Sequence, residues 1–135
     1  MGGPEAPLRI VSDQVSRECS DFVADLCRRF ADHLRGRPVS YADVQIDTGG
    51  LTPLQQALAG ALRTVPWGET VTYGELALSA GRPGAARAAG SFCAESAWSL
   101  IVPCHRVVAA GGIGGYGATG VGAKRRLLRL EGVVL

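Results

Sequence analysis

The sequence contains few of the residues that build disulfide-linked or metal-bound domains. Among 135 residues there are two histidines and four cysteines, and no two cysteines form a C-x-x-C pair. Cys19 and Cys27 fall about two turns apart on an expected helix, too far for a disulfide. A tetrahedral zinc site needs clustered pairs of cysteine and histidine. The pattern therefore argues against both a disulfide framework and a zinc site.

Long apolar runs are also missing. No run approaches the roughly 20 residues that a membrane-spanning helix needs, and residues 1–5 lack the basic start and apolar stretch of a signal peptide. Apolar residues make up 47% of the chain and charged residues 19%, which is typical of globular proteins. We expect a cytoplasmic protein without a membrane partner, long enough for one domain with a real core.

The net charge of +2 is small, but the charges are unevenly distributed. Residues 1–47 carry six Lys/Arg against eight Asp/Glu, whereas residues 48–135 carry eight against four. The basic later part allows a phosphate-bearing partner. On charge alone, an ordinary solvated surface is the simpler interpretation.

Hydrophobic periodicity predicts a mainly α fold with a small β element. Thr52 with Pro53, and Thr72 with Glu75, are residue types that begin helices. The short break at residues 81–83 between two expected helices indicates a helix-turn-helix. The expected helices cover residues 17–34, a segment that starts at Pro53, and residues 73–80, 84–94 and 121–130.

Two further segments are expected to be extended. Residues 44–46 have the composition of a short strand, and residues 100–108 are strand-like although Pro103 interrupts them. Residues 1–16 show no clear period, so we expect a loose arm there.

A glycine-rich loop over residues 109–120 contains a G-x-G-x-x-G match from Gly112 to Gly117. In a dinucleotide-binding fold this motif follows the first strand of a βαβ unit, with further strands after it. The chain ends at Leu135, which leaves no room for them. We interpret the loop as flexible backbone whose N–H groups line a pocket.

The most informative segment places a thiol beside an imidazole, at Cys104 and His105 after Pro103. A thiol is a strong nucleophile only as the thiolate, which a nearby base or cation favours. Neighbours on a strand point to opposite faces, so a water molecule would connect the two side chains. Glu131 is a candidate to orient the imidazole. The alternative is an inert core thiol beside a structural histidine.

In these residues the sequence resembles the O6-alkylguanine-DNA alkyltransferases (methylated-DNA–protein-cysteine methyltransferases). The resemblance covers about residues 50–135, and its most specific part is the P-C-H-R-V core. The matching motifs are Val65–Tyr73, Ala85–Gly90, Ile101–Val108 and Lys124–Gly132. It implies a winged helix-turn-helix-like alkyltransferase domain over residues 48–135. Residues 1–47 would be a loose arm plus the remnant helix of an N-terminal sheet subdomain that is otherwise truncated.

The resemblance also implies a reaction. An alkyl group would move from guanine O6 in DNA to Cys104, once per protein molecule, with His105 and Glu131 as the other catalytic residues. The family's chemistry implies no cofactor and no metal.

The implied partner is double-stranded DNA containing O6-alkylguanine, bound by a monomer through the minor groove with the damaged base flipped out. Arg87 would fill the gap left by that base, and Tyr73 would crowd the 3′ phosphate and contact the guanine. The other implied substrate-binding residues are Val107, Tyr116, Gly117 and Ser96; the other implied DNA-binding residues are Thr72, Ala85, Ala86, Ala88 and Gly90.

The sequence departs from the family pattern at several positions. Ser96 and Ala97 stand where the family has Asn-Pro, the loop after Tyr116 is one residue longer, and Leu54 and Ala59 replace two aromatic residues. These departures keep open an alkyltransferase-like protein that recognises the lesion without reacting. A third hypothesis is a cysteine hydrolase that turns over many times.

Overall fold

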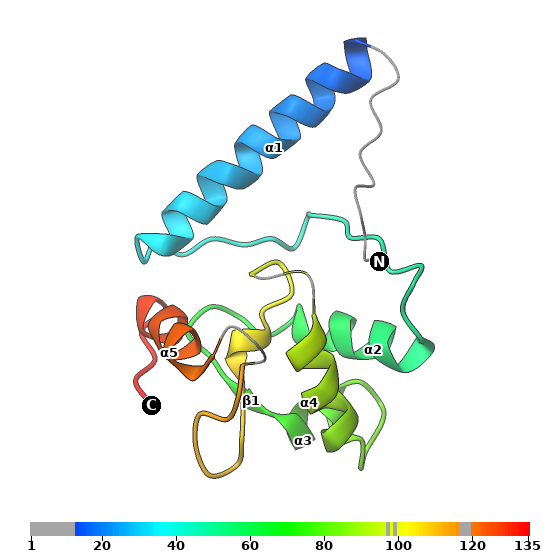
Figure 1. The fold of residues 1–135 in the computed structure, drawn as a ribbon, viewed down its shortest axis with the longest axis vertical. Coiled ribbons are helices and arrows are strands. Elements are labelled where there is room, and N and C mark those ends of the chain that lie inside the picture. The colour runs from blue at the N-terminus through cyan, green and yellow to red at the C-terminus, as the bar shows by residue number, and fades with distance from the viewer. Residues whose placement is uncertain (1–12, 97, 99, 117–119) are drawn as a thin grey trace.

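The computed structural model describes residues 13–96, 98, 100–116 and 120–135, and within them the chain is mostly helical (Figure 1). The prediction of a mainly α fold with a small β element is confirmed. The helices are α1 (Asp13–Leu34), α2 (Pro53–Leu62), α3 (Tyr73–Ser79), α4 (Ala86–Glu95), the short 3-10 helix η1 (Cys104–Arg106) and α5 (Val121–Leu130). The strands are β1 (Val71–Thr72) and β2 (Val107–Val108).

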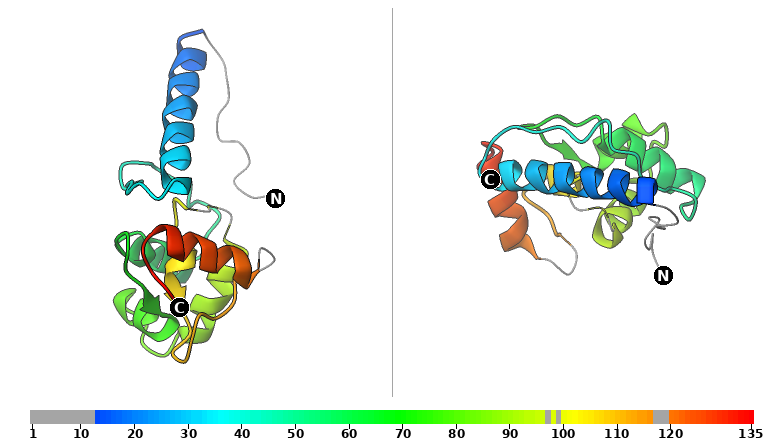
Figure 2. Two further views of the ribbon diagram at one scale, coloured as in Figure 1. Left: turned by 90° about the vertical axis from the view of Figure 1, so that its left-hand side faces the viewer. Right: turned by 90° about the horizontal axis from the view of Figure 1, so that it is seen from above.

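Helix α1 projects away from the body that the later helices form (Figures 1 and 2). It begins at Asp13, four residues before the predicted start, and the last of its residues lie against α5. It ends where predicted, because Gly36 adopts a left-handed φ of 77° that glycine accepts without strain. The predicted arm over residues 1–12 lies outside the described residues.

The two predicted helix N-termini are confirmed. Thr52 caps α2 and exchanges hydrogen bonds with Gln55, while Thr72 caps α3 and exchanges hydrogen bonds with Glu75. Such caps satisfy backbone N–H groups that have no partner within the helix, each stabilising by about 1 kcal/mol.

Helices α3 and α4 pack against each other as the two arms of the predicted helix-turn-helix. Helix α4 begins at Ala86, two residues later than predicted, because Gly84 has a left-handed φ of 87°. After this turn, α4 packs Ala89 and Phe92 into the core.

The predicted strands are mostly wrong. Residues 44–46 are irregular, because the Val44 carbonyl accepts a bond from Arg63 instead of a neighbouring strand. In the segment 100–108 only Val107–Val108 is a strand, paired in parallel with Val71–Thr72. Leu100 has a φ of 69°, and Pro103 has no N–H to donate to a ladder, so the residues before β2 turn instead of extending.

A hydrophobic core joins α2, α3 and α4 to the segment around η1. Cys104 belongs to this core, which also includes Leu58, Leu62, Leu76, Ala89, Phe92, Val102 and Val107. The core therefore fixes the turn that carries Cys104 and His105 against α4.

The described helices include none that combines the length and apolarity needed to span a membrane.

Candidate active site

The 3-10 helix η1 holds Cys104 and His105 on one tight turn. The Pro103 carbonyl accepts the Arg106 N–H at 2.9 Å, and the Cys104 carbonyl accepts the N–H of Val107. Cys104 is 6% exposed and His105 is fully buried. The expectation of an extended strand at Cys104 and His105 is therefore wrong, because the segment forms a 3-10 turn.

The structure brings His105 together with Glu131, the C-cap residue of α5. The His105 Nε2 atom lies 2.7 Å from Glu131 Oε2, and the side chains of both residues are fully buried. Helix α5 and η1 also pack against each other. Their packing therefore fixes one end of the imidazole.

Two residues that sequence reasoning missed complete the surroundings of this carboxylate. Arg106 donates from Nε to Oε1 at 2.8 Å and from Nη2 to Oε2 at 2.9 Å. His33, near the end of α1, has its Nε2 atom 2.8 Å from Oε2. The sequence signal that could have identified Arg106 as a site residue is its position directly after the Cys-His pair. The sequence contains nothing that connects His33 with a residue 98 positions away.

The charge states follow from these contacts. Burial alone would raise the pKa of Glu131, but the hydrogen bonds from His105, His33 and Arg106 hold it well below its ordinary value. Burial lowers the pKa of His105 in spite of the raising effect of Glu131. The site is thus an ionised Glu131–Arg106 pair with a neutral His105.

The proton positions on His105 are then determined. An ionised carboxylate only accepts, so the His105 Nε2 atom carries the proton that it shares with Glu131. The Nδ1 atom of the neutral ring keeps its lone pair. This atom is buried and makes no hydrogen bond within the described part of the chain. His105 therefore presents a basic nitrogen inside the protein.

The surroundings of Cys104 favour its thiolate. A hydrogen bond from the Cys93 thiol lowers the pKa of Cys104, burial opposes this effect, and Ser96 and the Lys124 cation lower the pKa further. The predicted Ser96 is therefore at the site, whereas Cys93 on α4 was not predicted. The same hydrogen bond, together with burial, raises the pKa of Cys93, so Cys93 is the thiol that keeps its proton.

Tyr73 and Lys124 form one wall beside the two cysteines. Lys124 is fully buried, donates to the Gly115 carbonyl at 2.9 Å and lies 5.8 Å from the centre of the Tyr73 ring. The Tyr73 hydroxyl approaches the same carbonyl at 3.5 Å. Gly114 has a φ of 74°, and a Cβ there would lie 3.2 Å from the Tyr73 hydroxyl oxygen. The close approach of this loop to Tyr73 therefore requires glycine.

Tyr116 is half-buried and packs against the core cluster. Burial, with a smaller effect of Cys104, raises its pKa to about 12, so the ring stays neutral and can donate a hydrogen bond. The Val107 side chain is fully buried, and its backbone N–H donates to the Cys104 carbonyl. The prediction for Gly117 lies outside the described residues.

Apart from Thr72, the residues predicted to contact DNA lie on α4 and directly before it. Arg87 is exposed, while the small residues Ala85, Ala86, Ala88 and Gly90 are half-buried. A Cβ on Gly90 would touch the Tyr73 ring at 4.0 Å, so α4 lies directly over the wall beside Cys104. The half-buried Thr72 uses its hydroxyl to cap α3.

The donor atoms of His33, His105 and Glu131 lie within 4.8 Å of one another, a spacing that could suit a metal ion. Arg106 already neutralises the carboxylate, and each Nε2 atom uses its proton to bond it. A divalent cation would have to displace these protons next to a guanidinium. We interpret the cluster as a proton-sharing network.

Known proteins are similar to this chain in sequence and in fold. Residues 53–133 match the family described as "6-O-methylguanine DNA methyltransferase, DNA binding domain". The chain is 43% identical over 111 residues to a methylated-DNA–protein-cysteine methyltransferase of Salmonella typhimurium, covering 82% of this chain and 64% of the relative.

Two crystal structures extend the comparison. Mycobacterium tuberculosis OGT in complex with DNA has a TM-score of 0.71 at 42% identity, covering 79% of this chain and 64% of that one. S. pombe Atl1 in complex with damaged DNA containing O6-carboxymethylguanine has a TM-score of 0.51 at 27% identity, covering 59% and 76%. The chain thus spans less than two thirds of the length of the Salmonella and Mycobacterium proteins. It belongs to the 6-O-methylguanine DNA methyltransferase family, whose DNA-binding domain accounts for most of its length.

Proposed function

We propose that the protein repairs DNA by transferring the alkyl group of O6-alkylguanine to Cys104 in a single turnover. The observation that carries this proposal is a Cys104 thiol of lowered pKa next to His105, a residue of the same turn whose ring makes a buried contact with Glu131. A nucleophile beside an oriented neutral base is what activation of a thiol requires. The names of the relatives supply the substrate class.

The step is a displacement at the alkyl carbon. A bond forms between the Cys104 Sγ atom and that carbon, while the bond from the carbon to guanine O6 breaks and its electron pair stays with guanine. The thiol proton passes through a water molecule to the lone pair on His105 Nδ1. The leaving guanine takes up one proton. Because the thioether product is stable, each molecule reacts once, and the step needs no cofactor or metal.

The duplex would lie on α4, with the minor groove toward the small residues Ala85, Ala86, Ala88 and Gly90. These small residues allow close approach, and Thr72 caps the start of α3. Arg87 would enter the stack as the lesion flips out toward Tyr73 and Tyr116. The Val107 and Gly117 backbone would contact the guanine edge.

We assign binding of one duplex to a monomer, through an active-site domain over residues 48–135. Residues 1–47, which include α1, would lie outside this domain. The thiols of Cys27, Cys93 and Cys104 are free, as a reducing compartment such as the cytoplasm would keep them, and we place the protein there.

The test is incubation with a duplex that carries one O6-methylguanine, followed by measurement of intact mass and of guanine restored in the DNA. We expect the protein to gain the mass of one CH₂ unit, with one lesion repaired per molecule. Cys104→Ala should bind the lesion duplex and gain no mass. Repair of many lesions by one molecule, without a mass gain, would instead indicate a hydrolase.

A second candidate function is recognition of the lesion without transfer. The similarity to Atl1 and the presence of Ser96 at the family's asparagine position favour it. Preferential binding of the lesion duplex by the unmodified chain, with neither mass gain nor restored guanine, would support this function and overturn alkyl transfer.

A further inference from the structure

His33 is a buried histidine that the proposed reaction does not use. It lies near the end of α1, has no exposed surface, and makes a polar contact at each ring nitrogen. Its Nε2 atom is 2.8 Å from Glu131 Oε2 and its Nδ1 atom is 3.0 Å from the Tyr41 hydroxyl. The ring of Trp67 packs on it with centroids 4.7 Å apart. Both nitrogens are therefore satisfied by side chains from other segments.

The direction of each hydrogen bond follows from chemistry. Glu131 is ionised and accepts only, so His33 donates from Nε2. When the His33 ring is neutral, Nδ1 is an acceptor and the Tyr41 hydroxyl donates to it. Burial raises the pKa of Tyr41 to about 12, which keeps this donor protonated at neutral pH. The chain of donors thus runs from Tyr41 through His33 to the oxygen of Glu131 that also holds His105.

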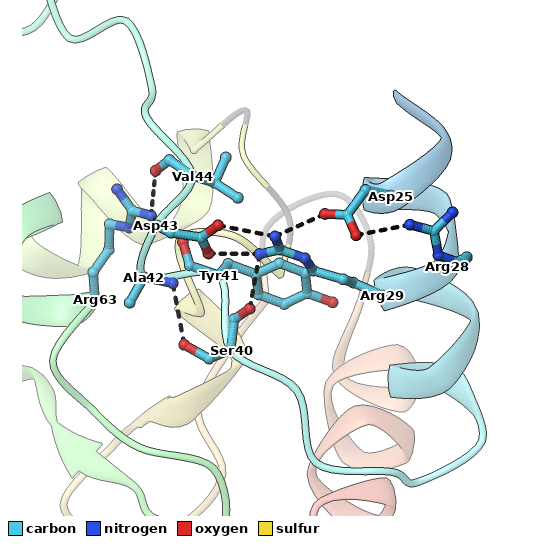
Figure 3. A network of polar contacts seen from close by, with 9 residues as sticks. All are labelled: Asp25, Arg28, Arg29, Ser40, Tyr41, Ala42, Asp43, Val44 and Arg63. Atoms are coloured by element: carbon cyan, nitrogen blue, oxygen red, sulfur yellow. Dashed lines mark hydrogen bonds and ion pairs between the residues drawn. The ribbon is translucent and has the colours of Figure 1, made fainter. Parts of the chain in front are cut away.

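The segment that carries Tyr41 is anchored on both sides (Figure 3). Arg29 of α1 binds Asp43 through two contacts of 2.6 and 2.9 Å, and it donates to the Ser40 carbonyl at 3.1 Å. From the other side, Arg63 donates to the carbonyls of Tyr41 and Val44 at 2.6 Å each. The backbone on both sides of Tyr41 is therefore fixed between α1 and the end of α2.

We propose that His33 is a positioning residue for the alkyl transfer, fixing Glu131 so that His105 keeps Nε2 protonated and Nδ1 free to accept the thiol proton. The inference rests on the proposed function, because it names what holds that function's base in place. It also assigns a role to the last turn of α1 and to Tyr41, which lie outside residues 53–133, the part that the family model matches.

The proposal predicts the direction in which the pKa of His105 moves when His33 is replaced. The groups that face His105 and Glu131 are His33, Tyr41 and Arg106. Removing the His33 donor makes Glu131 a stronger acceptor for His105, and it removes an imidazole whose presence lowers the pKa of His105. Both effects raise the pKa of His105. At neutral pH more of the rings would then be protonated and unable to accept the thiol proton.

The experiment compares His33→Leu, His33→Gln and Tyr41→Phe with the unmodified full chain. The glutamine amide can donate to Glu131 in place of Nε2, whereas leucine cannot. Arg28→Ala, an exposed position on the same helix, is the matched control. The single-turnover rate of methyl transfer from an O6-methylguanine duplex is measured against pH. Lesion binding and thermal unfolding are measured in parallel.

We expect His33→Leu to slow transfer about tenfold at pH 7, as a partial loss of general-base catalysis. The acid limb of the pH–rate profile of His33→Leu should shift to higher pH. The transfer rate of His33→Gln should be close to that of the unmodified chain. Tyr41→Phe should shift the acid limb of its pH–rate profile in the same direction, by a smaller amount than His33→Leu. Unchanged profiles in all variants, or a slower rate with the limb unmoved, would overturn the proposal and leave His33 a packing role.

Titration of the His105 ring by ¹⁵N NMR, without DNA, separates the two proposals. A higher pKa of His105 in His33→Leu than in the unmodified chain supports the positioning role even if no alkyl transfer is observed. An unchanged pKa overturns the positioning role even if transfer is fast.

Discussion

The Nε2 atom of His105 lies 2.7 Å from Oε2 of Glu131, although 26 positions separate the two residues. The contact joins η1, which carries Cys104, to the end of α5. It is buried, and Arg106 neutralises the carboxylate. Glu131 therefore both balances the buried charge of Arg106 and orients His105, and two of the predictions below depend on these contacts.

Glu131→Gln should destabilise the fold. The substitution leaves the buried Arg106 cation without its counter-charge, and breaking a buried ion pair in this way costs about 3 kcal/mol or more. Urea unfolding followed by circular dichroism measures the loss. Glu95→Gln, exposed at the end of α4, is the control and should change the free energy of unfolding by less than about 0.5 kcal/mol. Equal effects of the two substitutions would contradict the assignment.

Stability should fall as the solution becomes acidic. The pKa of His105 is lowered, so below its ordinary value near 6.5 the unfolded chain takes up a proton that the folded chain excludes. The pKa of Glu131 is also lowered, so its contribution is fully present above about 4.3 and is lost as pH falls below that value. Urea unfolding between pH 8 and pH 4 should show a decreasing free energy. A constant value over that range would contradict these charge states.

Cys93→Ala should raise the pKa of the Cys104 thiol. The largest lowering effect on that thiol is the hydrogen bond from Cys93, and Ser96→Ala should act in the same direction with a smaller effect. The measurement is the rate of carbamidomethylation of Cys104 by iodoacetamide against pH, followed by peptide mass. Cys27→Ala, in the exposed part of α1, is the control. The hydrogen bond would be refuted by a Cys104 pKa that stays the same in Cys93→Ala.

Arg87→Ala should slow repair of duplex DNA more than reaction with free O6-benzylguanine. Arg87 is exposed on α4, outside the buried network, and base flipping costs a few kcal/mol that an inserted side chain offsets. We expect a loss of about tenfold or more on the duplex and little change with the free base. Arg82→Ala, in the turn before α4, is the control. An equal loss on both substrates would argue against insertion into the stack.

The helices were predictable because local residues begin and end them. Thr52 and Thr72 cap α2 and α3 where the sequence placed them, and α5 has its predicted bounds. The strand over residues 100–108 was not, because a positive φ at Leu100 and the η1 turn depend on tertiary packing. A proline inside the run was the local indication of a turn.

The site was predictable only in part. The structure places Ser96 beside Cys104 and Glu131 against His105, while their roles in a reaction stay predictions. His33 and Cys93 could not be found in this way, because their importance depends on contacts with Glu131 and Cys104 across the fold. A histidine on an apolar helix face gives no indication of the carboxylate that it meets.

The most direct test of the central claim is the location of the transferred methyl group. After reaction of the full chain with an excess of O6-methylguanine duplex, peptides that contain Cys93 and Cys104 are sequenced by tandem mass spectrometry. We predict one added CH₂ unit on Cys104 and none on Cys93. Methyl on Cys93, or restored guanine with both thiols unmodified, would contradict the account.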